Sequence, residues 1–113
     1  MPFVYTRTDV KPAHVEFQHR HNDGGILNVV EEERTLDEHA RLEHLRWVIA
    51  YPGVLSHIGE AIDEHTWRTT IVFKDEDAYN NYVSDVVTQP VVIARKAWAK
   101  EHGVVSTFET KTV

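Results

Sequence analysis

The chain contains no cysteine and a single methionine among its 113 residues. Without cysteine there is no disulfide framework, no thiolate zinc site and no cysteine nucleophile. No apolar run approaches the ~20 residues that a helix needs to cross a bilayer. The first residues also lack the basic and then apolar pattern of a secretory signal. We therefore expect a soluble, cytoplasmic protein that does not contact a membrane.

Basic residues are scarce as well, with 12 Lys and Arg against 18 Asp and Glu and a net charge of −6. Because nucleic-acid phosphates require clustered Lys and Arg, and the sequence has no such cluster, a nucleic-acid partner is disfavoured. Apolar residues make up 42% of the chain, which is enough for the core of one domain. We expect a single domain over residues 1–113.

Histidine, by contrast, is abundant, with eight residues. Their protonation would change the net charge from −6 to +2, so we expect acid below pH ~6 to loosen a dimer that buries imidazoles. His19 and His21 share one face of a strand-like segment, a spacing that can bind a metal. The pattern supplies no clear third ligand, and we expect a polar strand there and no metal site.

From residue 26 the hydrophobic pattern predicts the order β-α-β-β-α-β. The first helix starts at a capping box, Thr35 to Glu38, and Pro90 is expected to kink or restart the second. Residues 1–25 are expected to form an N-terminal arm of one or two strands outside this plan. The predicted elements are strand 26–30, helix 35–51, strands 54–63 and 65–74, helix 75–103 and strand 104–113.

This order is that of a ferredoxin-like α+β subunit, a four-stranded antiparallel sheet with two helices on one face. The strand Ile26–Val30 carries apolar residues on both of its sides. Left in water, the second face of the sheet would be a sizeable apolar patch. We expect either a second copy of the chain or the N-terminal arm to cover it.

Two motifs carry a resemblance to a known family. Tyr51-Pro52-Gly53-Val54-Leu55 opens the second strand, and Thr70 to Tyr79 joins the third strand to an acidic helix start. With these motifs, residues 26–112 resemble the dimeric α+β barrel superfamily, in particular antibiotic biosynthesis monooxygenase (ABM)-like proteins. The resemblance implies a homodimer of face-to-face sheets, with a small pocket between sheet and helices in each subunit.

The activities implied by the resemblance include cofactor-free oxygenation of aromatic polyketides, lactone isomerisation, cyclisation and haem degradation. The haem-degrading branch has a Trp where this chain has Phe73, and a His on the second helix. No histidine occurs here from Glu76 through Glu101. Haem degradation is therefore disfavoured, and we expect no cofactor.

His57 is the principal candidate for catalysis, because an imidazole in the pocket could serve as a general base near neutral pH. Its alternative is a hydrogen-bonded interior or interface histidine. Tyr79 and Tyr82 are the other catalytic candidates, since a buried hydroxyl needs a partner. Asn28 on the first strand and three aromatic residues are the candidate ligand-binding residues, although plain core is the alternative for the aromatics: Trp67, Phe73 and Trp98.

Two functions of different class are compatible with these residues. The first is a cofactor-independent monooxygenase, isomerase or cyclase acting on a small aromatic or polyketide-like molecule in the sheet–helix pocket. The second is a non-catalytic dimer of the same fold that binds a ligand or a protein partner, with the N-terminal arm as its recognition element.

Overall fold

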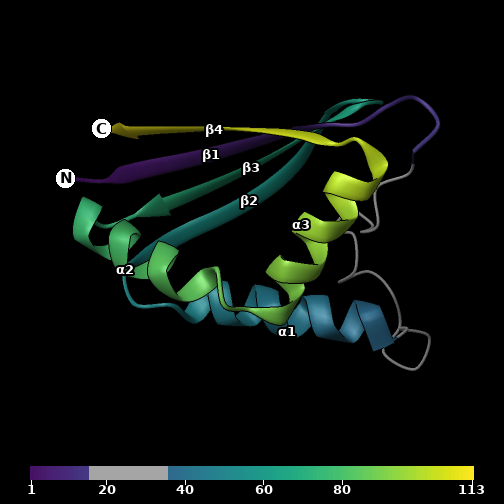
Figure 1. The fold of residues 1–113 in the computed structure, drawn as a ribbon. Helices are drawn as coiled ribbons and strands as arrows, with labels where there is room; N and C mark the ends of the chain where they lie inside the picture. Colours follow the sequence, from purple (N-terminus) through teal and green to yellow (C-terminus); the bar gives the residue numbers. More distant parts are fainter. Residues whose placement is uncertain (16–35) are drawn as a thin grey trace.

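A computed structural model describes residues 1–15 and 36–113, with the side chains of the first helix described from His39 onward. The order along the chain is one strand, one helix, two strands, two helices and a last strand (Figure 1). The elements are β1 (Phe3–Val10), α1 (Leu36–Ala50), β2 (Val54–Asp63), β3 (Thr66–Phe73), α2 (Glu76–Val86), α3 (Pro90–His102) and β4 (Val105–Thr112).

The strands form one antiparallel sheet in the order β2-β3-β1-β4. The three helices lie on one side of this sheet (Figure 1). This is the ferredoxin-like α+β arrangement that the sequence predicts, with β1 and β3 in the centre and β2 and β4 at the edges. No helix in the described ranges is long and apolar enough to cross a membrane.

The first strand of the sheet is not the one that the sequence analysis predicts. Residues 3–10 are not an arm beside the fold: they form β1, which pairs along its whole length with both β3 and β4. The pattern misleads because β1 points Arg7 and Asp9 inward, where they are buried at 8% and 7% exposure. The predicted strand 26–30, with Asn28, lies outside the described residues.

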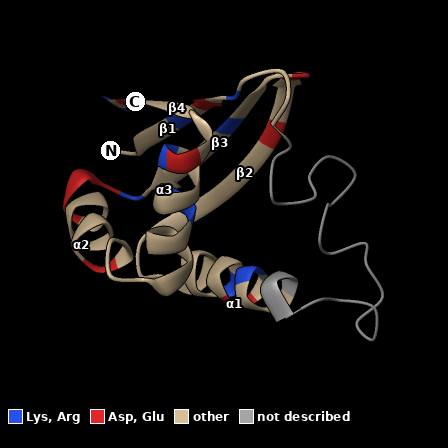
Figure 2. Ribbon diagram, turned by 45° about the vertical axis from the view of Figure 1, so that its right-hand side comes forward, with Lys and Arg blue, Asp and Glu red and all other residues tan. Residues whose placement is uncertain are grey.

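The predicted second helix is two helices. Asp75 caps α2 by accepting a hydrogen bond from the backbone N–H of Ala78 at 2.8 Å, and acidic residues gather at this helix start (Figure 2), where the helix dipole favours them. Pro90 stands at the first position of α3, where its missing N–H costs nothing. The expected break at Pro90 is therefore confirmed as a restart.

The two sides of the sheet differ in what covers them. Alternate residues of β3 are buried under the helices, from Trp67 to Phe73, while the residues between them are only half-buried. On the other side, which we call the open face, Val10, Ile58 and Val105 are 45%, 56% and 62% exposed. The uncovered second face that the sequence predicts is present.

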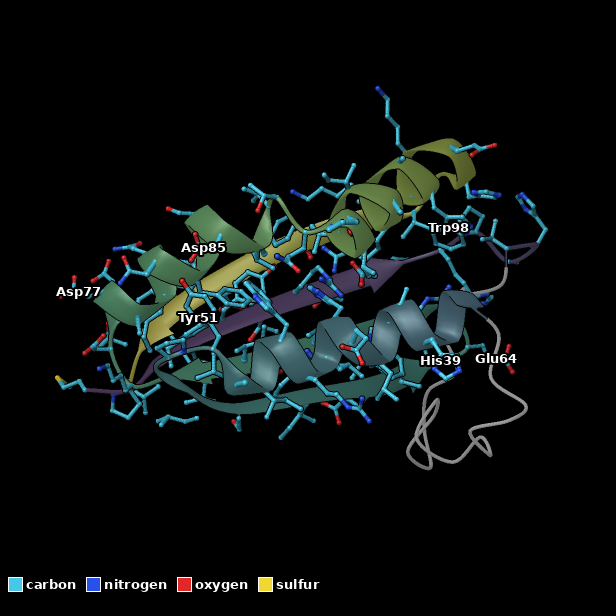
Figure 3. All side chains as sticks on the ribbon, turned by 90° about the horizontal axis from the view of Figure 1, so that it is seen from below. His39, Tyr51, Glu64, Asp77, Asp85 and Trp98 are labelled. Atoms are coloured by element: carbon cyan, nitrogen blue, oxygen red, sulfur yellow. The ribbon has the colours of Figure 1, made fainter. Side chains whose placement is uncertain are left out.

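The apolar core lies under the helices at the end of the sheet where β3 meets α2. It consists of Phe3, Val48, Ile71, Phe73, Ala78 and Tyr82. The hydroxyl of Tyr51, just after α1, donates a hydrogen bond to Asp85 of α2, and Figure 3 shows the two side chains facing each other. This bond ties the end of α1 to α2 beside the core.

Two glycines with positive φ offer a matched test of the packing between the β2 entry and α2. Gly53 has φ 89°, and a Cβ there would lie 2.5 Å from the Cβ of Ala78, whereas Gly103 has φ 73° and would meet Pro12 only at 3.6 Å. We expect Gly53→Ala to lower the free energy of unfolding by about 2–4 kcal/mol, from backbone strain and overpacking together. Gly103→Ala should cost about 1–2 kcal/mol, from strain alone. Urea denaturation measures both, and equal losses would contradict the close approach of Gly53 to α2.

Candidate functional site

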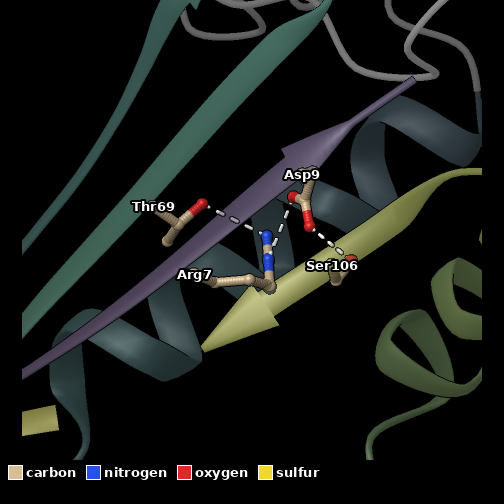
Figure 4. Close-up of polar contacts among 4 residues, drawn as sticks. All are labelled: Arg7, Asp9, Thr69 and Ser106. Carbon is tan, nitrogen blue, oxygen red and sulfur yellow. Dashed lines mark hydrogen bonds and ion pairs between the residues drawn. The ribbon is translucent and has the colours of Figure 1, made fainter. Parts of the chain in front are cut away.

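A row of polar side chains crosses the helix-facing side of the sheet, next to the apolar core. The strand register sets Arg7 of β1 opposite Thr69 of β3, and Asp9 opposite Ser106 of β4. Side chains directly opposite each other lie on the same side of a sheet. These four residues therefore project together toward the helices (Figure 4).

Hydrogen bonds link the four side chains in a row, from Thr69 through Arg7 and Asp9 to Ser106. Arg7 Nε donates to Asp9 Oδ2 at 3.0 Å, and Arg7 Nη2 donates to Thr69 Oγ1 at 3.1 Å. The hydroxyl of Ser106 donates to the other carboxylate oxygen, Asp9 Oδ1, at 2.6 Å. A buried ion pair is tolerated when such additional bonds satisfy its remaining polar atoms, which explains how a central strand accommodates two charges.

Two histidines lie close to this polar row. His57 of β2 pairs with Ile71, a buried residue under the helices, so its ring points to the helix-facing side. Burial and the neighbouring Arg7 cation lower its pKa. His44 of α1 has its pKa lowered to about 4 by burial, with Arg95, His57 and Arg7 adding to the effect. Both rings are therefore neutral at neutral pH.

Arg95 of α3 is a third charged residue near Arg7 and Asp9. Burial lowers its pKa to about 10, and the nearby Arg7 adds to that effect, but the guanidinium remains protonated at neutral pH. We call the seven residues the sheet–helix site: Arg7, Asp9, His44, His57, Thr69, Arg95 and Ser106.

The predicted tyrosines lie beside this site, in the core. Tyr82 is 6% exposed, and burial raises its pKa to about 12, so its hydroxyl keeps its proton at neutral pH. Tyr79 of α2 is half-buried, with ring centroids 4.8 Å from Phe3 and 5.9 Å from Tyr5. Their catalytic role stays a prediction.

The predicted ligand-binding aromatics fall in three different places. Phe73 is fully buried, at 0% exposure, in the centre of the core. Trp67 is also buried, beneath β2, where its ring leaves no room for a side chain at Gly59. Trp98 lies on α3 (Figure 3) and lines a cavity whose lining residues do not include His57.

Trp98 lines a separate cavity of about 600 Å³ near the far end of β1. Its ring stacks on His102 at a centroid distance of 4.9 Å, and the backbone carbonyl of Trp98 lies 2.9 Å from His102 Nδ1. The cavity also touches Pro12, His14, Val15, Glu101 and Gly103. No group of three or more metal-ligating side chains occurs in the part of the chain that the structure describes, and His19 and His21 lie outside it.

Sequence reasoning missed the charged half of the site. Arg7 and Asp9 fell in the segment interpreted as an arm, and Arg95 and His44 lie on predicted helices but were not among the candidate site residues. An available signal was the alternation Phe3, Tyr5, Arg7, Asp9, in which the two charges follow the apolar phase of the strand.

Comparison with known proteins establishes the fold. No protein-family model matches the sequence, and no curated protein matches it. Among solved structures, SnoaB, a cofactor-independent oxygenase from Streptomyces nogalater, is 12% identical with a TM-score of 0.54, covering 99% of this chain and 92% of its own. A candidate antibiotic biosynthesis monooxygenase from Deinococcus radiodurans is 13% identical with a TM-score of 0.56, over 98% and 91%.

A protein of unknown function from Nitrosomonas europaea, NE2512, matches equally well, with 10% identity and a TM-score of 0.55 over 100% of this chain and 90% of its own. At these identities the likeness concerns the fold alone. The chain shares the α+β fold of these structures, the fold that the sequence resemblance implies.

The two half-buried histidines, His44 and His57, make stability depend on pH. A histidine whose pKa is lowered by folding binds its proton more weakly in the folded chain than in the unfolded chain. Stability is therefore full above the ordinary histidine pKa of about 6.5 and falls as the pH drops toward 4. We expect the free energy of unfolding to fall by roughly 1–3 kcal/mol over this interval, after allowing for solvent contact of the half-buried His44.

Urea denaturation between pH 7 and pH 4.5 measures this loss. His44→Gln should make it clearly smaller, while His102→Gln, at an exposed position, should leave it unchanged. An equal pH dependence in all three proteins would contradict the assignment to His44.

Proposed function

We propose that the protein is a cofactor-independent monooxygenase acting on a small aromatic or polyketide-like molecule at the sheet–helix site, in the cytoplasm. The observation that carries the proposal is the pairing of a neutral histidine, His57, with the cation Arg7 on the helix-facing side of the sheet. The cation Arg95 belongs to the same group. A neutral imidazole can accept a proton, and a cation can stabilise the anion that results. SnoaB, which shares the fold, is a cofactor-independent oxygenase.

The reaction needs a substrate with an acidic CH₂ group conjugated to a carbonyl. His57 removes one proton from that carbon, and the electron pair spreads onto the carbonyl oxygen as an enolate. The guanidinium of Arg95 faces the developing negative charge. The carbanion forms a C–O bond with O₂, and the peroxide anion takes the proton back from His57. The hydroperoxide then loses water, so that CH₂ and O₂ become C=O and H₂O. The aromatic residues beside the site exclude water from the anion.

Removal of the proposed base tests the enzyme hypothesis. His57→Ala should lower the rate of O₂ consumption with an anthrone substrate by about 10²–10⁴-fold, the usual contribution of a general base. Oxygen-electrode traces at neutral pH measure the rate. His39→Gln on α1 is the control and should keep the full rate. A wild-type protein that consumes no O₂ with anthrones, or a His57→Ala protein at full rate, would contradict the proposal.

The second part of the proposal is a homodimer formed through the open face. The alternative function, a non-catalytic dimer that binds a ligand or a protein partner, would use the same interface. The support comes from the apolar side chains left in water on this face, among them Ile58, Val105 and Val10. Charged residues also stand on this face: Glu60 lies opposite Arg68 in the register of β2 and β3. The resemblance to dimeric α+β barrels implies that the sheets meet face to face.

The two equally exposed isoleucines give a matched test of this interface. Ile58 on the open face and Ile93 on α3 are both 56% exposed. We expect Ile58→Asp to convert the dimer to monomer, because a buried, unpaired charge at the interface is costly, and Ile93→Asp to leave it intact. Sedimentation velocity measures the mass. A wild-type monomer, or dissociation caused equally by both substitutions, would contradict the open-face dimer.

A further inference from the structure

The charges of the sheet–helix site do not balance. Its one carboxylate, Asp9, is fully engaged, since Arg7 binds one oxygen and Ser106 the other. Arg7 and Asp9 together are neutral. Arg95 then adds a second guanidinium, for which the described residues provide no hydrogen-bonded or ion-paired carboxylate. The site therefore carries a net charge of about +1 at neutral pH.

An uncompensated charge of this kind is unfavourable in the folded protein. Arg95 is half-buried, and burial and the like charge of Arg7 lower its pKa by more than the nearby Asp9 carboxylate raises it. Partly burying a cation without a partner costs free energy that an anionic ligand would recover. A cation that serves only to solvate the surface of the helix would be expected at an exposed position, such as that of the neighbouring Lys96.

His44 supplies a second polar group without a partner. Its Nδ1 atom is buried and makes no hydrogen bond to any described residue. The ring stacks on Trp47 at a centroid distance of 5.9 Å with an interplanar angle of 16°, which fixes its plane. Buried side-chain nitrogens are nearly always hydrogen-bonded in native proteins. An orphaned nitrogen close enough to Arg95 for that cation to lower its pKa is the kind of group that a ligand would complete.

At the β4 edge of the same site, aromatic side chains are exposed and a ligand could enter from solvent. Phe108 of β4 stands opposite Arg7 in the register, and yet it is 61% exposed, so the helices leave this part of the helix-facing side open. Tyr5 lies next to it, with ring centroids 6.1 Å apart. An aromatic ring entering over Phe108 would bring an attached acid group toward the two guanidinium groups.

We propose that Arg95, Arg7 and His44 form a subsite for the carboxylate of an aromatic acid, whose ring packs on Tyr5 and Phe108. Arg95 supplies the principal charge, Arg7 adds to the field while holding Asp9, and His44 donates a hydrogen bond from its free nitrogen. This names the substrate class for the proposed function and rests on that function only for the location of the ligand. Binding itself requires no turnover.

Titration with benzoate and benzamide, followed by nuclear magnetic resonance of the labelled full-length chain, tests the subsite. The two probes have the same ring and nearly the same shape, but only benzoate is charged. We expect saturable benzoate binding that shifts the resonances of His44 and Arg95, and binding of benzamide at least about tenfold weaker, because hydrogen bonds to a charged group are the stronger ones.

Arg95→Gln should weaken benzoate binding at least about tenfold, while Lys96→Gln, the removal of a neighbouring exposed cation, should leave it unchanged. His44→Phe keeps a ring against Trp47 and should weaken binding severalfold. The proposal is overturned if benzoate does not bind, if benzamide binds equally well, or if the Arg95 and Lys96 variants behave alike.

The binding test separates this inference from the proposed function. Benzoate binding that depends on Arg95 in a protein without oxygenase activity would support the subsite and reject the enzyme. Oxygenase activity that depends on His57, in a protein that does not bind benzoate, would support the enzyme and reject the subsite.

Discussion

The ion pair between Arg7 and Asp9 is the interaction on which the rest of the structure depends. It stands on β1, the strand that pairs with both β3 and β4, and it is buried on the side that faces the helices. A buried pair must have its remaining polar atoms satisfied. Thr69 and Ser106 do this from the neighbouring strands, so the pair also joins the three strands through their side chains.

The pair divides the helix-facing side of the sheet into two regions. At one end Phe3, Ile71 and Phe73 form an apolar core with α1 and α2. Beside this core the polar row meets His57, His44 and Arg95, and burial, together with the charge of Arg7, lowers the pKa of both histidines. An apolar region that stabilises the fold thus lies directly beside a polar region capable of acid–base and anion chemistry, within one small subunit.

The sequence predicts the fold from α1 onward well and the central strand β1 poorly. The alternation of β3, the acidic start of α2 and the break at Pro90 are local signals, and each has its expected structure. Residues 3–10 are predicted as a strand of an arm, but their place as β1 in the centre of the sheet is not predicted, because it depends on the two buried charges Arg7 and Asp9. Only pairing with Thr69, 62 residues away, and Ser106, 97 residues from Asp9, satisfies these charges. A prediction made from neighbouring residues in the sequence cannot detect such long-range pairing.

The same limit applies to the candidate site. His57 is a candidate from its position in a strand, but the sequence leaves open whether it points into the pocket or into a dimer contact. Its charged neighbours come from β1, α1 and α3 and meet only in the folded chain. Phe73 illustrates the reverse error, since an aromatic residue at strand spacing is as consistent with core as with a binding site.

A double-mutant cycle on the pair is the most direct measurement of its central role. Urea denaturation of Arg7→Met, Asp9→Leu and the double variant gives the coupling between the two side chains. We predict that each single substitution costs about 3–5 kcal/mol, because it leaves the other charge buried and unpaired, and that the double variant loses far less than their sum. Losses that simply add would contradict the account, because the two charges would then not depend on each other.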